Sequence, residues 1–351
     1  MERSERATDA GASLKPMRQM RRKTLDLGMA SLVKTSEIDA GQALPLVVRP
    51  AMPGVDLADW ARDNQQYLEE KLLVHGAILF RDFGLGSVSE FERAALAMCP
   101  DLFAEYGDLP REGVSDRIYA STPYPAEEMI LFHNESSHLP QWPRKQFFFC
   151  VQPSREGGET PLLDGRRVYQ ELEAEIRDRF AAKGLLYVRN FVPGIDVPWQ
   201  EFFHTSDCAA VERTCQAEGM QCEWKAGGGL RVSQRARAVL RHPKTGDMVF
   251  FNQVQLHHPS CLNPAVRESL NALFCDEDRP RNVCYGDGTP LEDAVMQKLG
   301  KLYERLAVQF PWKKGDLIFV ENMLVAHARN PFVGPRKICV AMGEMIRDRD
   351  L

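Results

Sequence analysis

The chain is interpreted outward from the stretch LFHNESSH at residues 131–138. Apolar runs flank it, EMILF at 128–132 and RKQFFFCV at 144–151, and both have the length and composition of β-strands. Successive side chains of a strand point to opposite faces. A strand that reaches residue 135 would therefore place His133 and Glu135 on one face and Asn134 on the other. One imidazole and one carboxylate would then point into the same cavity.

A second imidazole on a neighbouring strand would complete a set of two histidines and one carboxylate. That set is typical of non-haem Fe(II) oxygenases, because it leaves positions on the metal open for other ligands. His327 is the candidate, since strand-like runs flank it at 315–322 and 336–342. Taken alone, His-x-Glu predicts little, because any two polar residues on a strand's wet face produce it. His327 alone would more often be a hydrogen-bonded core histidine.

Strand-like runs recur along the chain, at 44–50, 76–83, 159–164, 184–191, 247–253, 315–322 and 336–342. Helical patterns are fewer, at 56–73, 87–98, 167–180 and within 290–310. Strands and helices do not alternate steadily, which argues against a doubly wound or TIM-barrel fold. The sequence predicts a mainly β protein with helical decoration (α+β), built as a closed or sandwiched antiparallel barrel. Such a barrel brings His133 and His327 from distant strands to one mouth.

Composition predicts one sizeable folded unit with a tail. The chain has 351 residues, of which 44% are hydrophobic and 26% charged, enough apolar material for a large core. Residues 1–40 are polar with a basic cluster at 15–23, and we predict a flexible basic tail there. Residues 41–351 are predicted to form a single domain. Within it, 193–228 is the least regular stretch and is expected to be a lid or substrate-binding insertion.

Charge and cysteine content exclude several classes of function. A net charge of −5 gives no electrostatic basis for nucleic-acid binding, and no apolar run approaches the roughly 18 residues that span a bilayer. Nine scattered cysteines without a Cys-x-x-Cys pair predict reduced thiols in a cytoplasmic protein. Cys208, Cys215 and Cys222, with His204 nearby, suggest a zinc site, but spacings of seven match none of the usual ligand pairs.

Several motifs together resemble the TauD/TfdA-type Fe(II)/2-oxoglutarate dioxygenases, over roughly residues 44–345. These motifs are HGAILFR at 75–81, FHNE at 132–135, GGETPL at 157–162, FFNQ at 250–253 and NMLVAHARNPF at 322–332. The resemblance implies a double-stranded β-helix, the jelly-roll or cupin-like barrel. HNESSH at 133–138, WPRK at 142–145 and NPF at 330–332 further resemble the SyrP-like branch, which is related to clavaminate synthase and associated with hydroxylation of amino acids for nonribosomal peptides.

The resemblance assigns roles that the chemistry of the residues supports. His133, Glu135 and His327 match the family's metal triad, with neutral imidazoles and a hard carboxylate for Fe(II). Arg336 matches the arginine that binds the distal carboxylate of 2-oxoglutarate, since a guanidinium fork can bind a carboxylate through two hydrogen bonds. Thr160 matches the threonine that donates to the same carboxylate.

Some positions depart from the family pattern. Arg336 follows His327 by nine residues, an interval shorter than expected, so Arg347 remains an alternative for the cosubstrate carboxylate. Ala328 stands where the family usually has glycine. Arg329 could bind a substrate carboxylate or pair on the surface, and Asn252 could orient substrate or cap neighbouring backbone.

The resemblance implies an enzyme that uses Fe(II), 2-oxoglutarate and O2 to hydroxylate an unactivated C–H bond of an amino acid. The substrate would be a small molecule, free or tethered to a carrier protein, in the biosynthesis of an antibiotic or another specialised metabolite. The same oxidation could instead give desaturation, epoxidation or cyclisation. Related halogenases lack the carboxylate ligand, so Glu135 argues against halogenation. A ligand-binding barrel without catalysis is the alternative outside the enzyme class.

Overall fold

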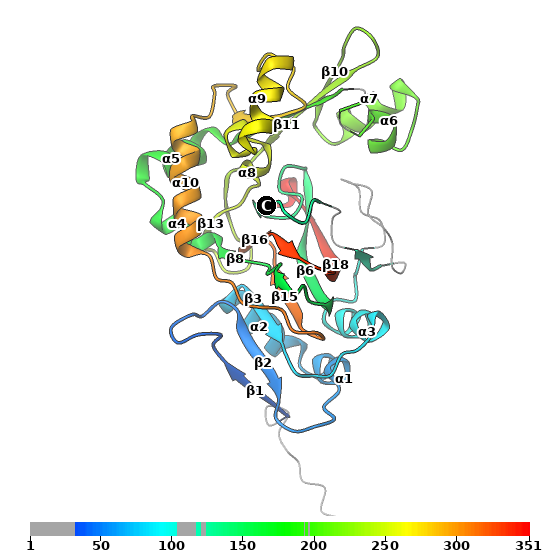
Figure 1. Cartoon of the computed structure of the whole chain (residues 1–351), viewed down its shortest axis with the longest axis vertical. Coiled ribbons are helices and arrows are strands. Elements are labelled where there is room, and N and C mark those ends of the chain that lie inside the picture. The colour runs from blue at the N-terminus through cyan, green and yellow to red at the C-terminus, as the bar shows by residue number, and fades with distance from the viewer. Residues whose placement is uncertain (1–31, 104–116, 121–123, 193, 196) are drawn as a thin grey trace, which may run out of the picture.

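Seven strands form the largest sheet of the structure, a computed structural model that describes residues 32–103, 117–120, 124–192, 194–195 and 197–351 (Figure 1). Their order is β1 (Val33–Ser36), β2 (Leu46–Pro50), β3 (Ala77–Phe80), β15 (Leu317–Glu321), β6 (Gln141–Gln152), β18 (Lys337–Arg347) and β4 (Tyr119–Ala120). Only β2 and β3 pair in parallel; the other neighbours are antiparallel. β1 lies inside the predicted tail, whereas residues 1–31 of that tail lie outside the described residues.

A second sheet packs face to face against the first. It has the order β5 (Ile130–His133), β16 (Val325–Arg329) and β8 (Leu162–Asp164). One apolar core joins the two sheets, with Phe148 and Ile318 on one side and Leu162 and Val325 on the other. Side chains two positions apart on a strand point the same way. His327, like Val325, therefore points into the space between the two sheets.

The prediction of a closed barrel is wrong for the residues that the structure describes, and the fold is a mixed α/β sandwich. Closure would require the outer strands of the small sheet to pair with the large one. β5 and β8 are only four and three residues long, and their strand partner is β16 alone. Side-chain packing therefore holds the two sheets together without a continuous hydrogen-bond ladder. The sandwich alternative of the prediction is what the chain adopts.

Three early helices cover the outer face of the large sheet: α1 (Leu57–Asp63), α2 (Gln65–His75) and α3 (Val88–Met98). The FFF run of β6 shows the alternation of a strand. Phe147 and Phe149 point into this helix-covered core, while Phe148 points into the core between the sheets. Phe91 of α3 stacks on Phe149 with ring centroids 5.0 Å apart. Helix α3 thus supports β6, a strand that also carries residues next to the site.

Helix α3 begins with a capping box. The Ser87 hydroxyl accepts a hydrogen bond from the Glu90 amide at 3.3 Å, and Glu90 Oε2 accepts one from the Ser87 amide at 3.0 Å. We expect Ser87→Ala to lower the free energy of unfolding by about 1 kcal/mol, because the first turn loses a side-chain acceptor. Urea denaturation measures this, with Ser269→Ala on an exposed helix as control. Equal stability of both variants would contradict the capping role.

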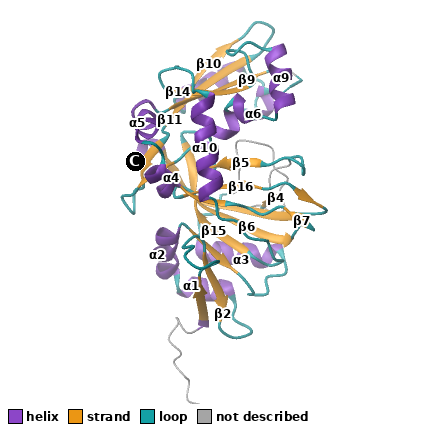
Figure 2. Ribbon diagram, turned by 60° about the vertical axis from the view of Figure 1, so that its left-hand side comes forward, coloured by secondary structure: helices purple, strands orange, loops and turns teal. Residues whose placement is uncertain are grey.

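Helices also cover the far face of the small sheet. They are α4 (Gly165–Glu171), α5 (Ala174–Lys183) and α10 (Asp293–Leu306), and they share a core with Phe132, Ala326 and Ala328 (Figure 2). The single helix predicted at 167–180 is two helices, since α4 ends at Glu171 and α5 begins after Glu173. The remaining short elements are α8 (Val254–His257), η2 (Pro259–Cys261), α9 (Pro264–Leu273), η3 (Asp348–Asp350), and the pairs β12 (Val239–Arg241) with β13 (Met248–Phe250) and β7 (Glu156–Gly157) with β17 (Phe332–Val333).

The stretch predicted to be irregular, 193–228, includes three regular elements. It contains α6 (Trp199–Phe202), α7 (Cys208–Ala217) and β10 (Gln221–Trp224). β10 joins a four-stranded sheet with β11 (Leu230–Ala236), β9 (Leu185–Phe191) and β14 (Arg281–Tyr285). Figure 1 shows this sheet at the end of the molecule opposite α1 and α3. It has its own small apolar cluster around Phe191 and Trp199. No helix of the described residues has the length and apolarity to cross a membrane.

Candidate active site

Two histidines lie side by side on neighbouring strands of the small sheet. His327 of β16 is in register with His133 of β5, and their ring centroids are 4.3 Å apart. Nδ1 of His133 lies 2.8 Å from the carbonyl oxygen of Leu131. A carbonyl oxygen can only accept, so Nδ1 carries the proton and Nε2 is left with a lone pair. The backbone of β5 therefore sets the tautomer that can bind a metal.

Glu135 lies next to the two histidines, but in a turn and not on the strand that was predicted to carry it. β5 ends at His133, and Glu135 lies in the turn that follows, with Ser136 in the left-handed region at φ 57°. The convergence is nevertheless as expected, because the ligand atoms of His133, Glu135 and His327 all lie within 4.8 Å of one another. Glu135 and His327 are buried. Left-handed backbone at a non-glycine residue is uncommon and is often found at functional sites.

Strand β6 supports two of the three side chains. Gln146 donates a hydrogen bond from Nε2 to Glu135 Oε2 at 3.0 Å, and Gln146 is fully buried. The ring of Phe148 lies 4.9 Å from that of His327. One carboxylate oxygen of Glu135 is thus held by an amide, and the imidazole of His327 is held by an aromatic ring.

The donor set fits Fe(II). Two imidazoles and one carboxylate on one side of a metal leave several positions for other ligands. Among the described residues, this is the one group of three His, Cys, Asp or Glu side chains whose ligand atoms are this close together. The zinc alternative at Cys208, Cys215 and Cys222 gains no support there. Burial raises the pKa of the Cys215 thiol to about 12, which disfavours the thiolate that zinc requires.

Thr160 lies buried just before β8, the strand that pairs with β16. Its Oγ1 accepts a hydrogen bond from Trp312 Nε1 at 3.2 Å, so the hydroxyl proton remains available to a further acceptor. Arg336 donates from Nε to the carbonyl oxygen of Gly158 at 2.9 Å, two residues before Thr160. The pairing of β7 with β17 brings these two segments together.

Arg336 is a half-buried cation whose side-chain hydrogen bond goes to a main-chain carbonyl oxygen and not to a carboxylate. Burial and the nearby charge of Arg329 lower the pKa of its guanidinium. An anion that binds there would relieve both effects. Arg347, the alternative, lies at the other end of β18, about 36 Å away at ~3.3 Å per residue. Of the two arginines, Arg336 is the one that contacts the segment of Thr160, through the Gly158 carbonyl oxygen.

Arg329 and Asn252, which were predicted to contact the substrate, form hydrogen bonds with main-chain groups. Arg329 is buried and donates to three carbonyl oxygens, those of Tyr124, Pro125 and Glu128, so it is not a surface ion pair. Asn252 accepts from the Val254 amide at 3.1 Å. Their direct roles toward a substrate stay predictions.

A second group of polar rings lies apart from the metal-ligand group. The ring of His138 is 5.2 Å from that of His257 and 5.8 Å from that of Tyr187, and Gln253 contacts both histidines. His138 lies in the turn after Glu135 and not on a strand. Neither His138 nor His257 belongs to the close group that His133, Glu135 and His327 form. Together with residues of β9 and the insertion, these rings line a cavity.

Comparison with known proteins agrees with this geometry. The family model described as taurine catabolism dioxygenase TauD, TfdA family, matches residues 41–342. The dapdiamide synthesis protein DdaC of Enterobacter agglomerans is 34% identical over 276 residues, covering 78% of this chain and 84% of DdaC. A clavaminate synthase-like protein of Arabidopsis thaliana is 28% identical over 297 residues, covering 80% of this chain and 85% of the relative.

Solved structures share the fold. PvcB from Pseudomonas aeruginosa matches with a TM-score of 0.53 at 13% identity, over 90% of this chain and 94% of PvcB. The family match spans most of the chain, and the residues that the family needs for iron converge in the structure. The chain therefore belongs to the TauD/TfdA family of Fe(II)- and 2-oxoglutarate-dependent dioxygenases.

Proposed function

We propose that this dioxygenase hydroxylates an unactivated C–H bond of an amino acid, free or tethered to a carrier protein, in the biosynthesis of a nonribosomal peptide or another specialised metabolite. The observation that carries the proposal is the close group formed by His133, Glu135 and His327 in a chain of this family. The presence of the carboxylate supports hydroxylation over halogenation. The similarity to DdaC, named for dapdiamide synthesis, and the SyrP-like motifs support a role in specialised metabolism.

In the proposed site, His133, Glu135 and His327 hold Fe(II). With 2-oxoglutarate and O2, the bound iron supplies the oxidation that turns 2-oxoglutarate into succinate and carbon dioxide and inserts one oxygen atom into a C–H bond. The protein itself orients the metal ligands and excludes water from the site. Gln146 fixes one oxygen of Glu135, and the Leu131 carbonyl fixes the His133 ring. Burial of Glu135 and His327 keeps bulk water from the reacting atoms.

Thr160 and Arg336 are proposed to bind the distal carboxylate of 2-oxoglutarate. The support is their chemistry and place: a hydroxyl with its proton available and a half-buried guanidinium, on two segments that β7 and β17 hold together. A charge-assisted pair with a guanidinium in a dry site is stronger than the same pair in water. The pair would fix the cosubstrate at one end while its keto acid end faces the metal.

The insertion at 193–228 is proposed to shape substrate selectivity. It contributes Phe202 and Met220 to the cavity that His138, Tyr187 and His257 also line. An aromatic wall with imidazoles and an amide suits a small amino-acid-like molecule with an apolar part and a few hydrogen-bonding groups. Arg329 and Asn252 would help to position the substrate by fixing the loops to which they are hydrogen-bonded.

The test is anaerobic reconstitution with Fe(II) and 2-oxoglutarate, followed by exposure to O2 with a panel of amino acids. Each amino acid is offered free and as a pantetheine thioester. We expect succinate to form in step with a product that has gained one oxygen atom. A product that has lost two hydrogen atoms would replace hydroxylation by desaturation. If iron binds but no panel member stimulates succinate formation, the amino-acid substrate class is wrong.

A further inference from the structure

The backbone around Glu135 has lost its strand partner, because β5 ends two residues earlier. A metal ligand in a turn needs another source of rigidity, since an error of about 0.5 Å in its position already weakens a site. The donor and acceptor of residue 135 must also be satisfied, because the segment is buried. The structure meets both needs with one side chain.

That side chain is Asn322, which directly follows β15 and is fully buried. Its Oδ1 accepts from the Glu135 amide at 2.7 Å, and its Nδ2 donates to the Glu135 carbonyl oxygen at 3.0 Å. Both polar groups of the Glu135 main chain are therefore paired with one carboxamide, as they would be with a neighbouring strand. Nδ2 also donates to the Pro143 carbonyl oxygen at 2.8 Å, which ties the turn to β6.

Asn134 adds a second link between the same segments. Its Nδ2 donates to the main-chain oxygen of Asn322 at 2.7 Å, and its Oδ1 accepts from the Asn252 amide at 3.1 Å. The Asn134 amide in turn donates to the Asn252 carbonyl oxygen at 3.1 Å. The residue between the two ligands on the chain is thus hydrogen-bonded to the main chain of both Asn322 and Asn252.

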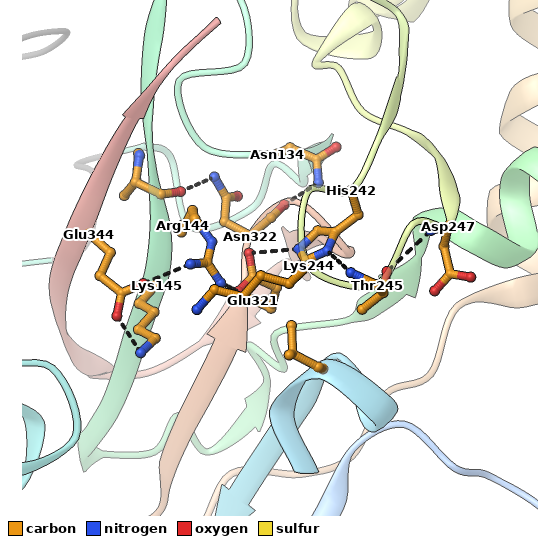
Figure 3. Close-up of polar contacts among 12 residues, drawn as sticks. Asn134, Arg144, Lys145, His242, Lys244, Thr245, Asp247, Glu321, Asn322 and Glu344 are labelled. Atoms are coloured by element: carbon orange, nitrogen blue, oxygen red, sulfur yellow. Dashed lines mark hydrogen bonds and ion pairs between the residues drawn. The ribbon is translucent and has the colours of Figure 1, made fainter. Parts of the chain in front are cut away.

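Asn322 is itself anchored by a buried ion pair (Figure 3). Its amide donates to the Arg144 carbonyl oxygen at 2.7 Å, and the preceding Glu321 accepts from Arg144 Nη2 at 2.7 Å. Glu321 is fully buried, and Arg144 also pairs with Glu344 at 2.9 Å. A broken buried pair costs several kcal/mol, so this anchor moves little.

We propose that Asn322 is the positioning residue for Glu135: its carboxamide acts as the missing strand partner and fixes the carboxylate for the metal. This rests on the proposed function, in which Glu135 is a metal ligand. Partners behind a metal ligand typically change metal affinity about 10–100-fold when removed. We expect a change of that size from a residue that touches neither metal nor substrate.

The experiment titrates Co(II) into the metal-free full-length protein by calorimetry and records the Co(II) absorption spectrum. Asn322→Ala should weaken Co(II) binding about 10–100-fold and alter the spectrum, because Glu135 is no longer held. Asn322→Asp keeps the size and the acceptor for the Glu135 amide but loses the donor, and should weaken binding less. Asn190→Ala is the matched control, since Asn190 is also buried and donates to two carbonyl oxygens, those of Glu277 and Arg279. It should lower the melting temperature without changing Co(II) affinity.

Folded Asn322→Ala with wild-type Co(II) affinity and spectrum would overturn the inference. If that variant does not fold, wild-type affinity and spectrum in Asn322→Asp would overturn it instead. Glu135→Ala, titrated in parallel, separates the two proposals. Undiminished Co(II) binding by Glu135→Ala removes Glu135 from the metal site and with it the proposed function. Weakened binding by Glu135→Ala, with no effect of the Asn322 variants, removes only the positioning role.

Discussion

Replacing Glu135 with alanine is expected to abolish hydroxylation and to weaken iron binding by more than about 100-fold. The magnitude follows from comparison with indirect effects, since the loss of a partner behind a ligand already costs about 10–100-fold. Alanine leaves two imidazoles on the metal and removes its negatively charged ligand. It also leaves the buried Nε2 of Gln146 without its carboxylate acceptor. The measurements are the Fe(II) content after anaerobic reconstitution and the rate of succinate formation.

The control for this prediction is Glu268→Ala, which removes an exposed carboxylate on α9. It should leave iron content and turnover unchanged. Circular dichroism and melting temperature would show that the Glu135 variant is folded. A folded Glu135→Ala protein with undiminished iron content and hydroxylation would show that the carboxylate of residue 135 does not bind the metal.

The individual strands and helices could be predicted from the sequence, but whether the two sheets close into a barrel could not. Runs of apolar residues predicted the main strands, and the helical pattern at 87–98 predicted α3. What sequence periodicity cannot show is whether the edge strands of two sheets meet. Here β5 and β8 are too short to pair beyond β16, so the sheets pack as a sandwich. Residues 193–228 looked irregular because their helices are short and their apolar residues pack in a small separate cluster.

The site was predictable from chemistry more than from secondary structure. A histidine and a glutamate two residues apart, with a distant histidine, suffice to suggest the metal group. The strand argument for Glu135 was wrong in detail, because β5 ends at His133. Gln146 and Asn322 were missed, although a glutamine within the apolar run of β6 is a signal that a buried polar partner exists. The partner itself depends on contacts between residues far apart in sequence, which no local pattern encodes.

Replacing Arg336 with alanine is expected to raise the 2-oxoglutarate concentration needed for half-maximal turnover by about 30-fold or more. Truncation of one partner of a buried, hydrogen-bonded charge pair costs about 2–5 kcal/mol, and about 1.4 kcal/mol corresponds to tenfold. The distal carboxylate of 2-oxoglutarate would enter a buried site without its counter-charge. The rate at saturating 2-oxoglutarate should fall less, because the carboxylate takes no part in bond breaking and its binding is similar in ground and transition states.

Two further variants show whether the effect belongs to the guanidinium at this position. Arg336→Lys keeps a charge but loses the fork, so it should bind 2-oxoglutarate more weakly than the wild type and more tightly than the alanine variant. Arg347→Ala removes an arginine from the far end of β18 and should leave the 2-oxoglutarate requirement unchanged. An unchanged requirement in Arg336→Ala, together with a raised one in Arg347→Ala, would move the cosubstrate carboxylate to the other end of the strand.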